Sequence, residues 1–476
     1  MKNKLSCGED KITNIMLKNI SEKFKLVLLR LCKISINSIQ TPELWKKVIV
    51  RMIPKKKDGK KNPKNYRPIS ITSCVARLCE RFILIEINEH LKENKIIIKQ
   101  QSGFRSFRQT KDNIFAICQR SLEAFNTKKK NCVIFFDISK AFDKIWQNGL
   151  LFKMKKLKFK DVIIKWLYSF LKGRTFTIKI NNSYSRYRKI ETGVPQGGVL
   201  SPILFSIFIN DMIDERTIFK KNEVHSNLFA DDLAANCASS KPTVIEKTMD
   251  IFLSKLEKWL YRWRLDMNPK KCQYIVFGKG LNKNPVNIKL KLFNDYIPKA
   301  NSIKFLGITL DYQLSFNECI NEIVTKCNGR LNILKILSNK SWCLSSDTLK
   351  CIYFSLIRSI IEYNSMVFPL ISETNKKRLR AIQYKALKIA YKKPLKTTTT
   401  ELLTLSKATK LDERIKILNE KYFENCIKSN NELVKEIVKN YLNWYTINRN
   451  SKYKTILCNY RKSIENEYLS EDESIS

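Results

Sequence analysis

The chain has 476 residues, enough for two or three domains with sizeable cores, and its 43% hydrophobic content excludes disorder over most of its length. Lysine and arginine number 89 against 44 aspartate and glutamate residues, which gives a formal net charge of +45 at pH 7. Such an excess favours a polyanionic partner, and nucleic acid is the first candidate. AT-rich codons would also enrich lysine, asparagine and isoleucine, so composition alone leaves both explanations open.

The cysteine and histidine content argues against a zinc-binding domain. The 14 cysteines are scattered without any Cys-x-x-Cys pair, and His90 and His225 are the two histidines, so a zinc finger or knuckle has no ligand set. No apolar run approaches the roughly 18 residues that a membrane-spanning helix needs. We see no targeting signal, and we expect reduced thiols, an intracellular location and no membrane partner.

Helical and strand-like patterns are mixed in the N-terminal third of the chain. Residues 1–50 have mainly helical spacing, and Val48–Ile53 is a plausible strand that leads into a basic, turn-rich loop. Residues 74–91 return to helical spacing. The continuous apolar run at residues 132–136 is typical of a strand that is buried on both faces.

Later segments predict buried helices and further strands. Ser201-Pro202 is a favourable helix start, because serine can cap free backbone N–H groups and proline fits the first turn. Residues 203–213 and 250–263 predict helices, and Asn268-Pro269 is expected to end the second of these. Strands are predicted at Gln273–Phe277 and at Phe305–Leu310 with a bend at Gly307, and helices from about residue 311 to the end.

Three aspartates on two short apolar segments carry the strongest chemical signal. Asp137 ends the run that begins at Cys132, and Asp231 and Asp232 lie between apolar residues on both sides. An isolated Asp-Asp pair is most often a surface turn, but surface turns are rarely so apolar, and two like charges repel unless a cation lies between them. We therefore expect a metal site formed by these residues.

The expected chemistry is nucleotidyl transfer with two metal ions. Two Mg²⁺ ions about 3.5–4 Å apart can activate a primer 3′-hydroxyl and neutralise the leaving pyrophosphate. Mg²⁺ prefers carboxylate oxygens and keeps several waters, so few protein ligands suffice, and Mn²⁺ is the alternative ion. Asp137 and Asp231 are the predicted bridging ligands, Asp232 is a less direct one, and Ile138 contributes its backbone carbonyl.

A glycine-rich loop and an aromatic residue are the candidate nucleotide-binding elements. In Gly193–Gly198 the missing Cβ atoms let the backbone approach a nucleotide, and Gln196 and Gly197 are the predicted contacts. Phe142 lies five residues after Asp137 and is placed to exclude a 2′-hydroxyl. The structural alternatives are a plain loop and a core phenylalanine.

Two basic residues are the candidate phosphate contacts. Arg67 has a planar guanidinium that suits phosphate oxygens, and we expect it to act with one lysine of the preceding basic loop. Lys271 is the candidate general acid that protonates the departing pyrophosphate. With 89 basic residues in the chain, an ordinary surface role remains the alternative for both.

Taken in order, these strings resemble the reverse transcriptases of non-long-terminal-repeat retrotransposons, closest to the Jockey-like and related groups. The resemblance runs from about residue 40 to residue 310. It rests on the strings Asn65–Ser70, Gln101–Arg105, Phe136–Asp143, Gly193–Pro202, Phe229–Asp232, Asn268–Cys272 and Phe305–Leu310. One departure is Gln147 after Trp146, where the family commonly has histidine.

The resemblance implies an α+β fold shaped as a right hand of fingers, palm and thumb. It implies that residues 1–36 form an N-terminal helical extension, residues 37–310 the fingers and palm, and residues 311–476 a thumb-like helical region. It matches the three aspartates, Lys271, Arg67, Phe142 and Gln196 to the family's site residues. It matches Phe305, Leu306 and Gly307 to the primer grip.

The function expected from residues and resemblance together is RNA-directed DNA polymerisation. The expected partners are an RNA template, a DNA primer or target and dNTPs, with the protein in the nucleus at its target DNA and in the cytoplasm when bound to RNA. The upstream endonuclease common in such elements does not fit in this chain, so we expect a truncated copy. The alternatives are an RNA-directed RNA polymerase and a non-catalytic nucleic-acid-binding remnant.

Overall fold

The chain divides into two compact units, and neither is a continuous stretch of sequence. The computed structural model describes residues 6–54, 62–138, 141–213, 224–281, 286–429, 431–447, 453–462 and 464–465. The first unit comprises residues 1–104, 137–220 and 253–268, and the second comprises residues 105–136, 221–252 and 269–476. The expected division into an N-terminal extension (residues 1–36), fingers and palm (37–310) and a thumb-like region (311–476) stays a prediction.

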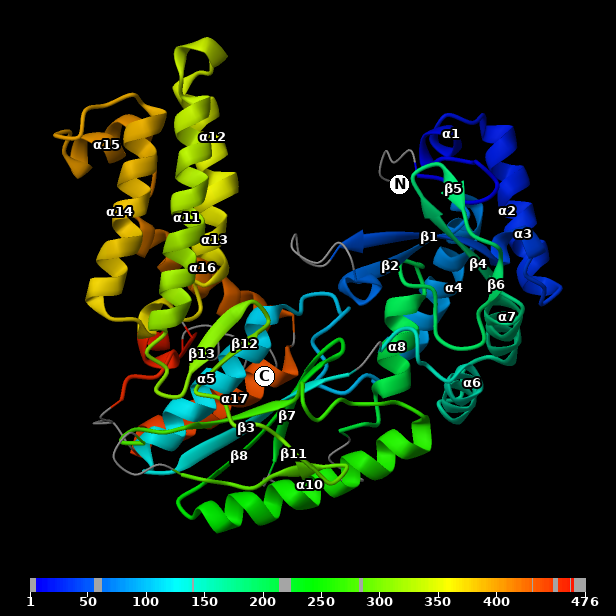
Figure 1. Cartoon of the computed structure of the whole chain (residues 1–476), viewed down its shortest axis with the longest axis horizontal. Helices are drawn as coiled ribbons and strands as arrows, with labels where there is room; N and C mark the ends of the chain where they lie inside the picture. The colour runs from blue at the N-terminus through cyan, green and yellow to red at the C-terminus, as the bar shows by residue number, and fades with distance from the viewer. Residues whose placement is uncertain are drawn as a thin grey trace, which may run out of the picture. The chain divides into compact units, whose positions relative to one another are not determined.

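The first unit contains a five-stranded sheet. Its strands are β1 (Lys47–Pro54), β2 (Tyr66–Ile71), β4 (Thr175–Ile180), β5 (Ser183–Tyr184) and β6 (Arg188–Lys189). The order is β2-β1-β4-β5 with β6 beside β4, and β1 is antiparallel to β2 but parallel to β4. Parallel neighbours need a long connection, and the segment between β1 and β4 includes α4 (Cys74–Glu93), α6 (Gln147–Lys156) and α7 (Asp161–Leu171) of this unit (Figure 1).

The other regular elements of the first unit are mainly helices. They are α1 (Asn14–Lys18), α2 (Glu22–Asn37), α3 (Glu43–Lys46), α4 (Cys74–Glu93), α6 (Gln147–Lys156), α7 (Asp161–Leu171) and α8 (Ser201–Ile209). Helix α6 packs against both α7 and α8. Helix α8 is almost entirely buried, as its uniformly apolar sequence requires.

The second unit is built on a four-stranded sheet of order β7-β8-β3-β9. The strands are β3 (Lys130–Asp137), β7 (His225–Phe229), β8 (Asp232–Ser239) and β9 (Gln273–Phe277). Strand β3 is buried from Asn131 to Phe136, as predicted for its continuous apolar run. The smaller hairpins are β10 (Lys291–Leu292) with β11 (Asp295–Tyr296) and β12 (Ser302–Phe305) with β13 (Ile308–Asp311).

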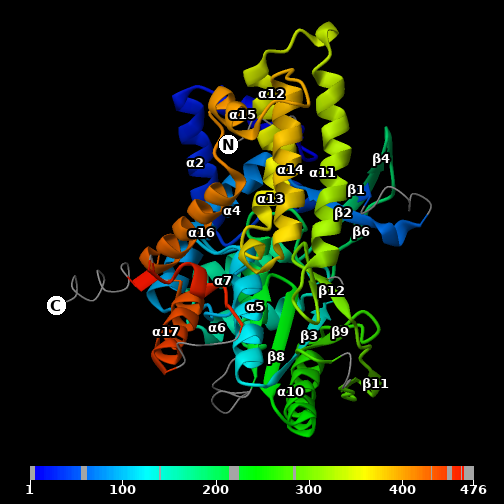
Figure 2. The ribbon, with the colours of Figure 1, turned by 90° about the vertical axis from the view of Figure 1, so that its left-hand side faces the viewer.

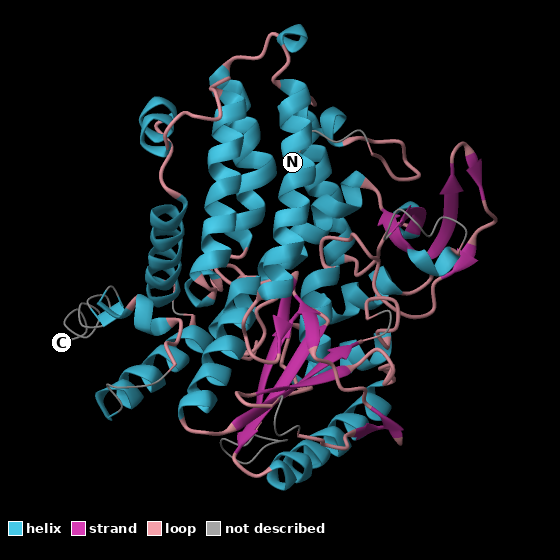
Figure 3. Ribbon diagram, turned by 60° about the vertical axis from the view of Figure 1, so that its left-hand side comes forward, coloured by secondary structure: helices cyan, strands magenta, loops and turns pink. Residues whose placement is uncertain are grey.

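Helices make up most of the rest of the second unit (Figures 2 and 3). They are α5 (Thr110–Asn126), α11 (Asn317–Leu337), α12 (Ser346–Tyr353), α13 (Ser359–Tyr363), α14 (Glu373–Ala390), α15 (Thr399–Ser406), α16 (Leu411–Lys428) and α17 (Glu432–Ile447). Helix α11 packs along α14 and α12. One continuous core joins the sheet residues Val133 and Phe135 to helical residues such as Leu331 and Phe423.

Helix α10 (Pro242–Trp263) contributes to both units, and its ends differ from the prediction. It begins eight residues earlier than the periodicity indicated, and it ends at Trp263 because Arg264 adopts a left-handed backbone with φ +56°. All 14 cysteines are free thiols. Within the part of the chain that the structure describes, no helix is both long and apolar enough to span a bilayer.

Candidate active site

The two adjacent aspartates lie at the tip of the β7–β8 hairpin. Phe229 pairs with Asp232, so Ala230 and Asp231 form a two-residue turn. Ala230 has φ +57°, a left-handed conformation that costs free energy for a residue with a Cβ atom. Apolar residues on both strands, including Leu228 and Leu233, are fully buried and anchor the hairpin. Asp232 is exposed and Asp231 is half-buried, so both carboxylates are accessible.

Asp137 is the last residue of β3, the strand next to β8. It is exposed, although the six residues before it are buried. The side-chain amide of Asn236 on β8 donates a hydrogen bond to Asn131 Oδ1 on β3 at 3.3 Å, which ties the two strands together. Ile138 is buried and forms a single β-bridge with Met267.

Lys271 lies in the turn that leads into β9. Strand β9 is antiparallel to β3, and Gln273 lies opposite Phe135. Lys271 therefore precedes Gln273 by two positions at the strand start, while Asp137 follows Phe135 by two positions at the strand end. The Lys271 side chain is exposed.

The glycine-rich loop is fastened to the segment that follows Asp137. The Gly193 backbone N–H donates to the Ile145 carbonyl at 2.8 Å, and the Val194 N–H donates to the Phe142 carbonyl at 2.9 Å. Gly193 has φ +81°, and a Cβ atom there would lie 2.6 Å from the Asp143 carbonyl oxygen. Only glycine fits this approach without a backbone shift.

The tip of the same loop contacts the strand that holds Arg67. The Ser70 N–H on β2 donates to the Gln196 carbonyl at 2.7 Å, and Gly197 has φ +110° with no room for a Cβ atom beside Ser70. The side-chain Oε1 of Gln196 is buried, and it has no hydrogen-bond partner among the described residues. Arg67 is exposed and lies opposite Ile53.

The Phe142 ring packs between two other phenylalanines. It stacks on Phe205 of α8 with ring centroids 4.8 Å apart, and its edge contact with Phe104 has a centroid separation of 6.1 Å. The ring is half-buried. Core packing therefore accounts for part of its surface, and the sugar-selecting role stays a prediction.

The predicted strand Phe305–Leu310 is instead a hairpin of two strands. Phe305 pairs with Ile308, and the turn residues Leu306 and Gly307 have φ +46° and +82°. Phe305 packs on Phe135 of β3 with ring centroids 4.8 Å apart. The hydroxyl of Tyr363 donates to the Leu306 carbonyl at 2.7 Å, so the turn is held in place from α13.

The predicted serine cap of α8 is wrong, and a residue that the sequence analysis missed binds the backbone just before the helix. Helix α8 begins at Ser201 after Leu200, which makes no side-chain cap. Ser201 Oγ instead donates to the Pro195 carbonyl at 2.6 Å. The preceding N–H groups of Val199 and Leu200 donate to Glu80 Oε2 of α4, at 2.8 Å and 3.1 Å.

Glu80 is an unusual carboxylate because it is only 1% exposed. Burial raises the pKa of Glu80, while its two backbone hydrogen bonds and the positive charges of Arg174 and Arg77 oppose that rise. Arg174 is equally buried, and burial lowers the pKa of its guanidinium to about 10. The spacing of Glu80 from the apolar residues Ala76 and Ile83 could have indicated burial, but the local sequence does not reveal its partners, which lie 119 and 120 positions later.

The described residues contain neither a preassembled metal cluster nor the lysines expected beside Arg67. Among the described residues, no three His, Cys, Asp or Glu side chains gather closely enough to hold a metal ion. The lysines expected to act with Arg67, namely Lys55, Lys56, Lys57 and Lys60, lie outside the described residues. The donor chemistry of Asp137, Asp231 and Asp232, three accessible carboxylates, nevertheless suits Mg²⁺.

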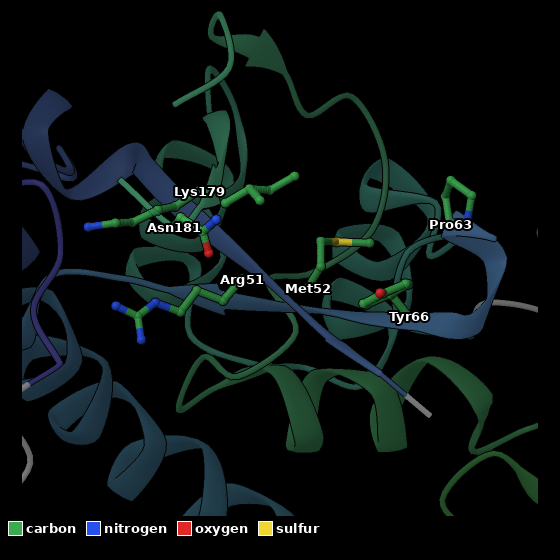
Figure 4. Close-up of a pocket in the computed structure, with 7 residues that line it drawn as sticks. Arg51, Met52, Pro63, Tyr66, Lys179 and Asn181 are labelled. Carbon is green, nitrogen blue, oxygen red and sulfur yellow. The ribbon is translucent and has the colours of Figure 1, made fainter. Parts of the chain in front are cut away.

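A pocket of about 570 Å³ lies on the sheet of the first unit (Figure 4). Arg51 and Lys179, directly opposite each other on the parallel strands β1 and β4, belong to its lining. No predicted site residue is among the described residues that line it, which are Arg51, Met52, Pro63, Tyr66, Lys179, Ile180 and Asn181.

The chain matches known proteins over most of its length. Residues 53–310 match the family model described as reverse transcriptase (RNA-dependent DNA polymerase). The probable RNA-directed DNA polymerase from transposon BS of Drosophila melanogaster is 30% identical and covers 81% of this chain. The RNA-directed DNA polymerase from mobile element jockey of the same organism is 27% identical and covers 90%.

These relatives are longer than the chain, which spans 42% of the first and 47% of the second. A solved structure of apo telomerase from Candida tropicalis covers 94% of this chain at 14% identity, with a TM-score of 0.42. The relatives confirm the resemblance to Jockey-like retrotransposon enzymes, and the mixture of helices and sheets confirms the α+β class. The chain therefore belongs to the reverse transcriptase (RNA-dependent DNA polymerase) family.

Proposed function

We propose that the chain is an RNA-directed DNA polymerase of a non-long-terminal-repeat retrotransposon. It adds nucleotides from dNTPs to a primer 3′-hydroxyl by two-metal nucleotidyl transfer. The observation that carries the proposal is one of sheet topology. Asp137 ends β3, Asp232 begins β8, and these two strands are neighbours in a single sheet. Paired carboxylates on adjacent strands supply the kind of ligand set that this chemistry needs.

Each carboxylate has a distinct role in the proposal. Asp137 and Asp231 would hold the Mg²⁺ or Mn²⁺ ions between them, with the Ile138 carbonyl as a further ligand and Asp232 as a less direct one. When bound, two such ions activate a hydroxyl and stabilise the charge on a leaving pyrophosphate. The strained turn at Ala230 supports this assignment, because strain in the backbone is often retained where function requires it.

The incoming nucleotide is proposed to contact the glycine-rich loop. The unpartnered Oε1 of Gln196 supports this role, because a buried acceptor without a donor is costly unless a ligand completes it. Gly197 lets the backbone approach the ligand, and Phe142 would exclude the 2′-hydroxyl of a ribonucleotide. The exposed guanidinium of Arg67 would bind triphosphate oxygens.

The leaving group and the primer involve the second unit in the proposal. Lys271 would donate a proton to the departing pyrophosphate, which an exposed ammonium can do. Phe305, Leu306 and Gly307 would position the primer strand, and their two-residue turn is rigid because Tyr363 holds it. Both roles remain untested predictions that follow from the family resemblance.

The proposed macromolecular partners are an RNA template and a DNA primer. The net charge of +45 supports both, because lysine and arginine contacts to phosphates dominate nucleic-acid affinity. The protein would act at target DNA in the nucleus and bind its RNA in the cytoplasm. Fractionation of cells that express a tagged chain tests this, and recovery from neither compartment contradicts it.

The deciding experiment is extension of a DNA primer on an RNA template by purified protein. Wild type should extend with dNTPs and Mg²⁺, Asp137→Ala should not, and Asp161→Ala, an exposed aspartate at the start of α7, should behave like wild type. Faster extension with ribonucleotides would favour an RNA polymerase. Tight duplex binding without extension in either Mg²⁺ or Mn²⁺ would favour a non-catalytic remnant.

A further inference from the structure

A buried carboxylate from α4 supports the nucleotide-facing loop of the first unit from behind. Glu80 Oε2 accepts the N–H groups of Val199 and Leu200, the two residues between the glycine-rich loop and α8. A Cβ atom on Gly198 would lie 3.4 Å from the same oxygen. The carboxylate is therefore packed against the loop backbone as well as hydrogen-bonded to it.

The hydrogen bonds matter because no other side chain among the described residues at the start of α8 accepts from these N–H groups. Leu200 has no polar side chain, and the hydroxyl of Ser201 is committed to the Pro195 carbonyl. Buried N–H groups that lose their acceptor pay their full desolvation cost. Arg174 and Arg77 supply the positive charge that makes a buried carboxylate tolerable at this position.

Two elements with predicted nucleotide contacts depend on the backbone that Glu80 holds. The Gly198 N–H and the Ser201 hydroxyl both close back onto the Pro195 carbonyl, which leaves Gln196 and Gly197 at the tip of a closed turn. Four residues into α8, Phe205 stacks on Phe142 with ring centroids 4.8 Å apart. A shift at Val199 and Leu200 would move the turn and the Phe205 ring together.

We propose that Glu80 is a positioning residue for nucleotide selection, which fixes the Gln196 turn directly and the Phe142 ring through α8. The assignment rests on the proposed polymerase function for the identity of the ligand. It predicts that loss of the Glu80 acceptor weakens nucleotide binding and also relaxes the preference for deoxyribose. If the carboxylate were purely structural, its loss would lower stability and change neither nucleotide binding nor the preference for deoxyribose.

The test measures nucleotide binding without chemistry. Wild type and variants are complexed with a primed RNA template, and the Kd values of non-hydrolysable deoxy- and ribonucleoside triphosphate analogues are measured in Mg²⁺. Glu80→Leu should raise the deoxynucleotide Kd about tenfold and lower the deoxy-to-ribo preference several-fold. Glu80→Gln should stay within about threefold of wild type, because its amide oxygen can accept the same N–H groups.

The control is Glu123→Leu, which removes a half-buried carboxylate whose pKa is also raised by burial, on α5 in the second unit. It should lower the unfolding temperature and leave both Kd values unchanged. If Glu80→Leu does not fold, Gly198→Ala replaces it, since its Cβ atom would lie 2.9 Å from Ser201 Oγ and 3.4 Å from Glu80 Oε2 and so crowd the same contacts.

Unchanged nucleotide affinity and sugar preference in folded Glu80→Leu would overturn the assignment. So would an equal rise in Kd for Glu123→Leu, because that would show a general loss of stability. If wild type binds the analogues with this Glu80 dependence but extends no primer, the polymerase proposal fails and the positioning role stands.

Discussion

The two units hold their candidate site residues by different physical means. In the second unit, Asp231 and Asp232 lie at the tip of a hairpin whose buried apolar strands fix its position. In the first unit, Gln196 and Gly197 lie on a loop whose shape depends on distant backbone partners, including Ser70 and the carboxylate of Glu80. The proposed metal ligands thus lie at the ends of buried strands, and the proposed nucleotide contacts lie on a supported loop.

The hairpin side of this comparison is tested most severely at Asp231. Asp231→Asn should lower extension about a thousandfold or more, because an amide cannot replace a carboxylate as a metal ligand. Template affinity should change little, since it comes mainly from phosphate contacts. Primer extension and filter binding measure the two effects.

Asp295→Asn is the control, because Asp295 lies beside the two-residue turn of another hairpin, β10–β11, at the position that Asp232 has in β7–β8. It should keep full activity. Substantial primer extension by Asp231→Asn would show that Asp231 is not a metal ligand, and the comparison between the two units would then fail.

The loop side is tested at Gly193, where a side chain has no space. Gly193→Ala should lower the free energy of unfolding by about 3 kcal/mol, because φ is +81° and the new Cβ atom would lie 2.6 Å from the Asp143 carbonyl oxygen. Gly280→Ala has a similar φ of +73° but open space, and should cost about 1 kcal/mol. Chemical denaturation measures the free energy of unfolding of both variants. Equal losses would show that the contact between Gly193 and the Asp143 carbonyl leaves room for a side chain.

The first unit also contains a buried lysine that should make its stability depend on pH. Lys153 of α6 donates to the Phe208 carbonyl and to Asp211, and its ammonium lies 3.8 Å from the centre of the Trp263 ring. Burial lowers the pKa of Lys153 to about 8, although Asp211 opposes the shift. Between this value and its usual 10.5, the unfolded chain binds more protons than the folded one, so stability rises with pH.

The gain from pH 8 to 10.5 should total roughly 3 kcal/mol in wild type. Lys153→Met should abolish the gain, and the exposed Lys165→Met should keep it. Unfolding curves across this pH window decide the question, and a wild-type slope in Lys153→Met would exclude Lys153 as its source.

The smallest expected effect concerns sugar selection. Phe142→Ala should lower the preference for deoxynucleotides about tenfold, because a cavity replaces the ring that excludes the 2′-hydroxyl. Competition between dNTPs and rNTPs in primer extension measures it, with the exposed Phe152→Ala as control. An unchanged preference for deoxynucleotides would show that Phe142 only packs in the core and does not act with the glycine-rich loop in nucleotide selection.

Local sequence patterns were sufficient for the strands and helices whose apolar residues repeat without interruption. Strand β3, strand β9 and helix α4 lie where continuous apolar runs or helical spacing predicted them. The pattern was insufficient at Phe305–Leu310, because Leu306 and Gly307 both adopt left-handed backbones and reverse the chain. An apolar run does not reveal such a reversal when only one of the two turn residues is glycine.

The candidate site shows the same limit. The aspartates, the glycine-rich loop and Phe142 could be identified as candidates because each lies in a short, recognisable sequence motif. The role of Glu80 could not, because its helical spacing from the apolar residues of α4 indicates a buried position but not the groups that it binds. Its partner N–H groups belong to Val199 and Leu200, and only the folded chain brings these together.

The way the backbone passes between the two units has a practical consequence for protein production. The chain crosses from one to the other after residues 104, 136, 220, 252 and 268. A single protease cut therefore releases neither as an intact piece, and no simple truncation isolates one of them. Any shortened version of the second unit must retain residues 105–136, 221–252 and 269–476 together, or its shared hydrophobic interior loses one wall.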